Sequence, residues 1–320
     1  MNSDYIREPK NGLVKFGPEV VAEIRKQCRM DKKQDREEAI RIIQEWIKQQ
    51  NHFVKKDFTK DYIERFLTCC NKGSVERVKK QLDKICTMRT LMPKFFHVTN
   101  LKKSDIPKIF DKVSFAVMPT LTPEYYRLLF IKAKPNAITT SYDYTLLYKL
   151  LVILAEYFSA HEYCRGFIVV GDYLDVNIID FLFKINLVEF QQFVPIITKG
   201  YGCKIKGIYL LTTSKMIERF ISMIKPMFSD KIGRRIQAVN KRSAIRDIVN
   251  SDWVPVAYGG KENSVEAFHV DFVEILSSEQ HEKRMAEMNK AVTDETKRQT
   301  DKFNEQYMGM PGTFRTLSLD

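Results

Sequence analysis

The stretch from residue 202 to residue 236 reads GCKIKGIYLLTTSKMIERFISMIKPMFSDKIGRRI. Its first part, KIKGIYLLTT at 204–213, is a short apolar run of the kind that forms a buried strand. In the part that follows, 214–228, Met, Ile and Phe recur at helical spacing, which predicts an amphipathic helix. Pro226 should end or kink this helix near Lys225. A strand followed by a helix that covers it is the basic unit of an α/β fold.

The same alternation of strand and helix extends on both sides of this stretch. Apolar runs at 126–134 and 165–173 predict two further strands, and 234–239 predicts a weaker one. Helical patterns lie between the runs, at roughly 141–161, 177–199 and 214–228. The predicted fold class is therefore α/β, with a mostly parallel sheet.

The remaining parts of the chain have a different character. Residues 1–15 form a polar N-terminal tail, and 16–92 predict an all-helical lobe of about four helices. We assign 93–262 to the α/β lobe and 263–320 to a charged C-terminal extension. The extension should be disordered in part, chiefly at 306–320, because it contains few large apolar side chains.

Composition limits the classes of partner and the cellular location. The chain has 320 residues and a net charge of +12, which favours anionic partners. We see neither a signal peptide nor a membrane span, since the most apolar run, 146–158, contains Lys149 and Glu156. The six cysteines include no Cys-x-x-Cys pair, so we expect reduced thiols, a cytoplasmic protein and no metal site.

Motifs of catalysis are missing from the sequence. We find no nucleophile elbow, phosphate-binding loop, zinc-protease motif or dinucleotide fingerprint. The five histidines are scattered, and no cluster of nucleophile and base is visible. We therefore expect no enzyme activity and no cofactor. A nucleic-acid partner is not expected either, because the basic residues are spread over the chain.

Basic side chains surround the predicted amphipathic helix. Strand alternation would place Lys204 and Lys206 on one face, with Ile208 and Leu210 deeper on that face. Lys231 and Arg235 stand four residues apart and would share a helix face. Two interpretations stay open. Either the helix covers the sheet and the cations are solvated, or it covers a cavity and the cations bind phosphate groups.

Residues 35–262 resemble the CRAL-TRIO family of lipid-binding proteins, in particular its tocopherol-binding and retinaldehyde-binding members. The resemblance rests on DYIERFLTCC (61–70), YD (142–143), GFIVVGDYLDV (166–176), KIKGIYLLTT (204–213), SMIKPMFSDKIGRRI (222–236) and VPVAYGG (254–260). It implies a helical lobe packed on an α/β lobe, whose sheet forms the floor of a hydrophobic pocket. A mobile gate helix at about 213–228 would close the pocket.

The resemblance also implies a function. The protein would carry a retinoid, carotenoid, tocopherol or other isoprenoid-like lipid between membranes, as a monomer that associates transiently with acidic membrane surfaces. Phosphatidylinositol phosphates would bind a basic cleft formed by Lys204, Lys206, Lys231 and Arg235. Lys79 would partly replace two arginines of the family motif, at whose positions Thr68 and Cys70 stand here. An alternative is a phosphoinositide-responsive membrane adaptor without transfer activity.

Alternation and helix faces together give a predicted pocket wall of thirteen residues, each of which could equally be plain core. They are Tyr148, Val152, Phe167, Val169, Phe181, Leu187, Ile196, Ile197, Ile208, Leu210, Phe220, Ile221 and Ile224.

Overall fold

A five-stranded sheet forms the centre of the molecule in the computed structural model, which describes residues 12–135, 143–182 and 184–298. The strands are β1 (Val113–Val117), β2 (Tyr126–Ala133), β3 (Gly166–Asp172), β4 (Ile205–Leu211) and β5 (Ile236–Val239), in that spatial order. Strand β1 is antiparallel to β2, and the other pairs are parallel. The predicted α/β class and its four predicted strands are confirmed. Strand β1 was missed because all five residues are buried and show no alternation.

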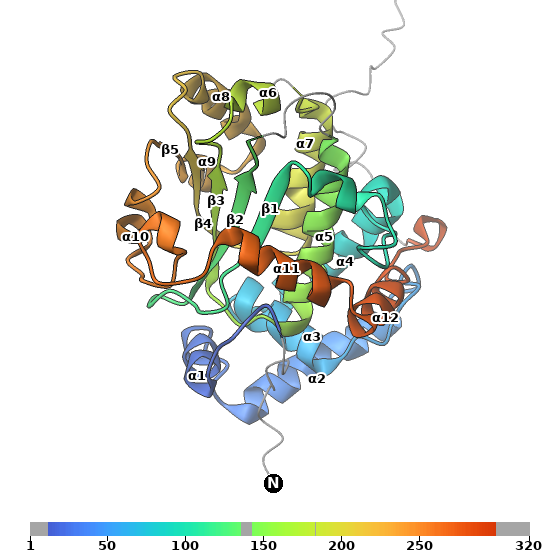
Figure 1. Cartoon of the computed structure of the whole chain (residues 1–320). Coiled ribbons are helices and arrows are strands. Elements are labelled where there is room, and N and C mark those ends of the chain that lie inside the picture. The colour runs from blue at the N-terminus through green and yellow to red at the C-terminus, as the bar shows by residue number, and fades with distance from the viewer. Residues whose placement is uncertain (1–11, 136–142, 183, 299–320) are drawn as a thin grey trace, which may run out of the picture.

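The helices that connect the parallel strands lie on one face of the sheet (Figure 1). They are α5 (Tyr144–His161), α6 (Ile178–Leu182), α7 (Leu187–Pro195) with the π-turn η4 (Ile196–Gly200), α8 (Ile217–Ile224) with the 3₁₀ turn η5 (Lys225–Met227), and α9 (Asp230–Gly233). Strands β2 to β5 follow one another in space as in sequence. Right-handed crossovers between such strands all fall on the same side.

The prediction of one helix over 177–199 is wrong. Helix α6 ends at Leu182, and Asn186 starts α7 by accepting hydrogen bonds from the backbone N–H groups of Val188 and Glu189. An asparagine cap of this kind competes with the continuation of a helix, so the chain turns here. The predicted helix end at Pro226 is confirmed, since α8 ends at Ile224.

The opposite face of the sheet is covered by α10 (Ala244–Val249) and the short 3₁₀ turn η6 (Val256–Tyr258). Asp172, at the end of β3, accepts hydrogen bonds from the Tyr258 hydroxyl (2.7 Å) and from Arg242 Nε (2.5 Å). This buried carboxylate fixes the closing VPVAYGG segment on the sheet, so the carboxylate has a structural role.

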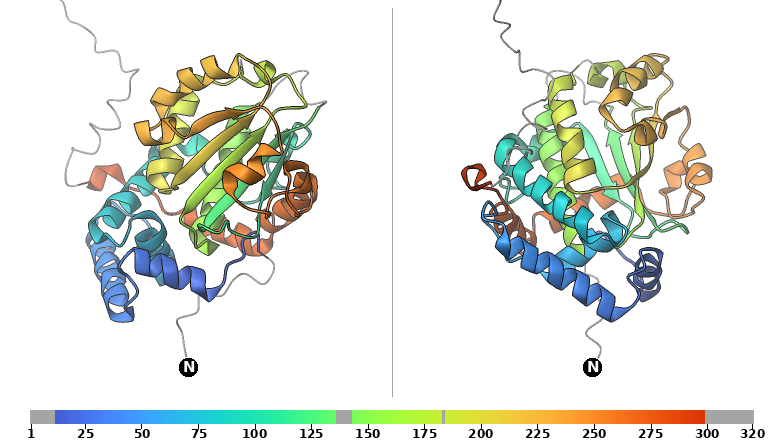
Figure 2. Two further views of the ribbon diagram at one scale, coloured as in Figure 1. Left: turned by 90° about the vertical axis from the view of Figure 1, so that its left-hand side faces the viewer. Right: turned by 180° about the vertical axis from the view of Figure 1, so that it is seen from behind.

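The helical lobe comprises α1 (Pro18–Gln27), α2 (Lys33–Gln49), α3 (Lys60–Arg65) continued by the π-turn η1 (Phe66–Cys70), and α4 (Val75–Leu91). Two 3₁₀ turns, η2 (Pro93–Phe95) and η3 (Ile106–Ile109), lead from it to β1. Arg89 of α4 forms a buried ion pair with Glu156 of α5, which also accepts from the Tyr201 hydroxyl at 2.7 Å. The views in Figure 2 show this lobe packed against one end of the α/β lobe.

The segment after the sheet contains α11 (Val265–Leu276), α12 (Glu279–Met288) and the 3₁₀ turn η7 (Glu295–Lys297). Helix α11 crosses the edge strand β1 (Figure 1), where the backbone N–H of Phe115 donates to His269 Nδ1 at 3.2 Å. The chain then reaches the helical lobe, where Arg298 binds Asp83 of α4. This segment therefore joins both lobes. The part of the extension that we predicted to be disordered, 306–320, lies outside the described residues.

Candidate functional site

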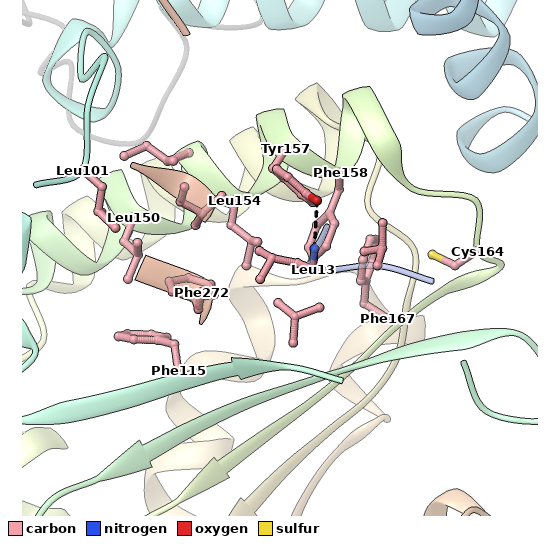
Figure 3. Packing of buried hydrophobic residues seen from close by; sticks show 14 of the residues in the cluster. Leu13, Leu101, Phe115, Leu150, Leu154, Tyr157, Phe158, Cys164, Phe167 and Phe272 are labelled. Atoms are coloured by element: carbon pink, nitrogen blue, oxygen red, sulfur yellow. Dashed lines mark hydrogen bonds between the residues drawn. The ribbon is translucent and has the colours of Figure 1, made fainter. Parts of the chain in front are cut away.

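An apolar cavity of about 160 Å³ lies between the sheet and helices α5 and α7. Eight of its lining residues are phenylalanines: Phe115, Phe130, Phe158, Phe167, Phe190, Phe193, Phe228 and Phe272. Figure 3 shows Phe158 and Phe167 facing each other from α5 and β3, with their ring centres 4.9 Å apart. Thr198 and Cys203 are the polar or weakly polar side chains of the wall. The cavity can therefore accommodate hydrocarbon along most of its length, with a polar group at one end.

Four of the thirteen predicted wall residues line this cavity: Phe167, Val169, Ile197 and Ile208. The others pack elsewhere. Tyr148, Val152 and Ile196 belong to the core that joins α5 to the helical lobe, and Phe181 packs on Tyr173. Leu187, the first residue of α7, is half-buried. Helix α5 packs against the helical lobe on one side and against the sheet on the other, so its apolar residues divide between two cores. For this reason Tyr148 and Val152 of α5 do not reach the cavity.

Four further predicted wall residues belong to a separate small core under α8. Phe220, Ile221 and Ile224 pack with Ile236 of β5, and Leu210 contacts the same cluster. Their helical spacing was predicted correctly, and they bury one face of α8 against the end of the sheet. Phe228, just beyond α8, reaches the cavity and contacts Phe190 at 5.8 Å between ring centres. The other face of α8 leaves Met216 and Met223 exposed.

A β-bulge at the start of β4 changes the predicted faces of that strand. Phe167 pairs with Ile205, but the next residue, Ile168, pairs with Gly207, so Lys206 is an extra residue. Ile205 and Ile208 consequently both line the cavity, although they are three positions apart. Lys204 stands just before β4 and lines a basic cleft, whereas Lys206 lies over the Tyr126 ring, so the prediction that these two lysines share one face is wrong.

A basic cleft of about 420 Å³ lies where the helical lobe meets the start of β4. Seven cations line it: Arg77, Lys80, Lys84, Lys199, Lys204, Lys231 and Arg235. Within the described ranges, none of the seven forms an ion pair with a carboxylate and no acidic residue lines the cleft. Burial, followed by the neighbouring ammonium groups of Lys199 and Lys80, lowers the pKa of Lys84. Such a cluster of unpaired cations attracts polyanions.

Three of the five predicted cations, Lys204, Lys231 and Arg235, line this cleft. Lys206 lies outside it, with Nζ 5.1 Å from the centre of the Tyr126 ring. Lys79 is also outside and donates to Glu76 at 2.8 Å. Arg235 has a second contact, since its Nη1 donates to the backbone oxygen of Ile205 at 2.5 Å.

Sequence reasoning missed the row of cations on α4. Arg77, Lys80 and Lys84 recur at helical spacing, and this pattern was a readable signal of a shared face. Only the packing of α4 beside η4, visible from behind in Figure 2, brings this row opposite Lys199 and Lys204.

The cavity and the cleft are neighbours. Thr198, Cys203 and Ile205 line both of them. A third, smaller space of about 40 Å³, which we call the neck, shares Phe167 and Cys203 with the cavity and Cys70 and Lys204 with the cleft. Burial raises the pKa of the Cys70 thiol to about 11 and that of Cys69 to about 12, so these thiols are neutral. The three spaces together suit a molecule, or a pair of molecules, that is apolar at one end and anionic at the other.

The described residues contain neither a candidate metal site nor a candidate membrane span. No group of three or more His, Cys, Asp or Glu side chains could hold a metal ion there. No helix in that part of the chain is both long enough and apolar enough to cross a membrane.

Two family models match the chain. Residues 32–106 match the family model described as "Pinta-like, UBA domain", and residues 111–260 match the CRAL/TRIO domain. No curated protein matches the chain significantly. One of the solved structures that match, "Crystal structure of Sfh5", has 12% sequence identity and a TM-score of 0.49, over 86% of this chain and 99% of that chain.

The fold, the apolar cavity and the matched family model define the class of protein: residues 111–260 form a CRAL/TRIO domain. This family binds hydrophobic lipid ligands, so lipid binding or transfer in general is the function of the class. The predicted domain boundaries at 15–16, 92–93 and 262–263 stay predictions, as does the likeness to the tocopherol-binding and retinaldehyde-binding members.

Proposed function

We propose that this protein is a non-enzymatic carrier that transfers a hydrophobic ligand between membranes. The ligand would be a retinoid, carotenoid, tocopherol or other isoprenoid-like lipid held in the apolar cavity. Phosphatidylinositol phosphates would bind the basic cleft while the protein is on a membrane. The protein would act as a cytoplasmic monomer with transient membrane association and no nucleic-acid partner.

One observation carries the proposal: the apolar cavity and the basic cleft share Thr198, Cys203 and Ile205 as walls. A headgroup in the cleft would therefore touch the same side chains as the end of a ligand in the cavity. Binding at one place would change the packing at the other. This contact gives phosphoinositide binding a physical route to ligand release.

Helix α8 is the proposed gate. It covers one end of the sheet through a core of six buried residues that is separate from the larger cores. The exposed Met216 and Met223 give its outer face an adaptable apolar surface suited to a lipid bilayer. Lys231 and Arg235, just beyond α8, line the cleft. A bilayer that attracts these cations would therefore also lie against α8.

Transfer between vesicles tests the proposal. A fluorescent isoprenoid lipid is loaded into donor vesicles, and its arrival in acceptor vesicles is followed with and without phosphatidylinositol bisphosphate in the acceptors. We expect the full-length protein to accelerate transfer, and the phosphoinositide to increase the rate further. Native mass spectrometry of the purified protein should show one bound apolar ligand. Absence of both transfer and bound ligand would exclude a carrier.

The adaptor without transfer activity stays the second candidate because the cavity is small. Its volume of about 160 Å³ is below the roughly 300–1,000 Å³ of most ligand pockets. A carrier would have to expand the cavity, for example by moving α8, whereas an adaptor would not. Phosphoinositide binding without any lipid transfer would favour the adaptor.

A further inference from the structure

Arg65, the last residue of α3, is a buried cation without a carboxylate partner among the described residues. Four arginines are buried among the described residues. Three of them have an ion pair: Arg36 with Glu64, Arg89 with Glu156 and Arg127 with Glu162. Arg65 is only 5% exposed and has no such pair within that part of the chain. Buried charges in proteins are normally paired, so this arginine requires an explanation.

The contacts of Arg65 do not neutralise it. Its Nη1 donates to the backbone oxygen of Asp61 at 3.1 Å, and the guanidinium lies 5.5 Å from the centre of the Tyr163 ring. Its Nε has no hydrogen-bond partner among the described residues. The adjacent Glu64 is engaged by Arg25 at 2.8 Å and by the Tyr163 hydroxyl at 2.6 Å. No carboxylate among the described residues therefore balances the charge of Arg65, and an anionic group of a ligand could pair with it.

The neck is where that anion fits, since Arg65 is one of its walls. The neck also contains the Lys204 ammonium group and several weakly polar thiols. Its one acidic wall residue, Glu162, is neutralised by two hydrogen bonds from Arg127, at 2.6 and 3.0 Å. The local charge of the neck is thus positive.

The size of the neck selects the kind of anion. The neck, at about 40 Å³, is much smaller than the cleft and suits a small anionic group such as a carboxylate. A phosphate ester has four oxygens around phosphorus and suits the cleft of about 420 Å³ better. The neck adjoins the apolar cavity through Ala155, Phe158, Phe167 and Cys203. An acid bound at Arg65 could therefore extend its hydrocarbon part into the cavity.

We propose that the neck binds the carboxylate of an apolar acid, such as a fatty or isoprenoid acid, through Arg65. This inference rests on the proposed function and narrows its ligand to a lipid with a carboxylate end. The acid pairs with the buried guanidinium of Arg65, and its tail fills the phenylalanine-lined cavity. Lys204, at the border of neck and cleft, would sense both the carboxylate and a headgroup.

Three probes separate the contributions of tail and charge. The full-length protein is titrated with oleic acid, oleyl alcohol and sodium acetate, each competing with the neutral dye Nile red for the cavity. We expect oleic acid to bind about 10- to 100-fold more tightly than oleyl alcohol, because charge-assisted hydrogen bonds to a buried guanidinium are strong. Acetate should bind weakly and should not displace the dye.

Arg65→Met and Arg65→Lys test the residue itself. The ratio of the affinity for oleic acid to the affinity for oleyl alcohol should fall to about one in Arg65→Met. Arg65→Lys should keep part of this ratio. Lys206→Met is the matched control and should leave the ratio unchanged, because Lys206 lies outside the neck. Thermal unfolding of ligand-free Arg65→Met should match or exceed the wild type, since an unpaired buried charge is removed.

A measurement on the wild type keeps the inference open to refutation if a variant does not fold. The carboxyl carbon of ¹³C-labelled oleic acid should keep the chemical shift of the ionised form between pH 7 and pH 5 when bound. Equal affinities for acid and alcohol would overturn the carboxylate site and leave the carrier intact. Failure of both to displace the dye would instead count against the carrier. Tight binding of acetate alone would show a site for free small anions and overturn the lipid acid.

Discussion

Lys204 and Lys206 are two positions apart in the sequence but have different surroundings in the fold. Lys204 lines the basic cleft and the neck, whereas Lys206 lies over the ring of Tyr126. Lys204 stands just before β4, and Lys206 is the extra residue of the β-bulge at the start of that strand. This pair therefore offers substitutions of the same residue type two positions apart, only one of which touches the cleft.

Lys204→Ala should weaken binding to vesicles that contain phosphatidylinositol bisphosphate by about fivefold, because one cation near an anionic membrane contributes about 1 kcal/mol. Lys206→Ala should change binding by less than about twofold. Vesicle co-sedimentation at two salt concentrations measures both, and the effect of Lys204→Ala should shrink at high salt. Equal losses in the two variants would mean that the headgroup does not occupy the cleft.

Val169 and Val170 form a second matched pair, on opposite faces of β3. Val169 lines the apolar cavity, and Val170 is fully buried in the core on the other face. Val169→Phe should fill part of the cavity, keep the free energy of unfolding within about 1 kcal/mol and abolish ligand uptake. Val170→Phe has no space and should lower that free energy by about 1–3 kcal/mol. Urea unfolding and dye binding distinguish the two. A large destabilisation by Val169→Phe would mean that the space beside Val169 cannot accept a larger side chain.

The contact between Arg298 and Asp83 should stabilise the junction of the C-terminal segment and the helical lobe. Arg298 donates to both oxygens of Asp83 at 3.0 Å, and its side chain is 7% exposed. Arg298→Ala should therefore cost about 2–3 kcal/mol of unfolding free energy. Lys297→Ala, at an exposed ion pair with Asp294, should cost less than about 1 kcal/mol. Urea unfolding measures both variants. Similar losses of stability in the two would mean that the contact between Arg298 and Asp83 does not stabilise the junction.

Three histidines, one buried and two half-buried, should make the protein less stable in mild acid. Burial, aided by nearby cations, lowers the pKa of His161 to about 3 and the pKa values of His269 and His281 to about 4. The unfolded chain binds these protons near pH 6.5, whereas the folded chain does not. The stabilisation is thus complete above about pH 6.5 and is lost as pH falls toward 4, by at most about 1.4 kcal/mol per pH unit for each histidine.

His281→Leu tests this dependence. Neither ring nitrogen of His281 has a hydrogen-bond partner among the described residues, so an apolar replacement should keep or raise stability at pH 7. The difference in urea midpoint between pH 7 and pH 5 should become smaller than in the wild type. His97→Asn, at an exposed histidine with positive φ, should leave that difference unchanged. If the pH dependence of stability is unaltered in His281→Leu, His281 does not contribute to the loss of stability in acid.

The spacing of apolar residues was sufficient to predict which side chains are buried where only one face of a segment packs against a core. The buried face of α8, with Ile217, Phe220, Ile221 and Ile224, follows from helical spacing because one core covers that face. The four parallel strands follow in the same way from short apolar runs between glycine and proline. The pocket wall on α5 could not be predicted, because that helix is buried on several sides and every apolar position looks alike.

By itself the sequence determined the α/β class, its parallel strands, the amphipathic helix α8 and the cations Lys204, Lys231 and Arg235 around it. Those features depend on local spacing and on neighbours in the chain. Only the tertiary structure decided the position of Lys206 outside the cleft, the row of cations on α4 that completes the cleft, and the burial of Arg65. Each of these depends on which residues distant in sequence become neighbours, and the packing of the two lobes sets that.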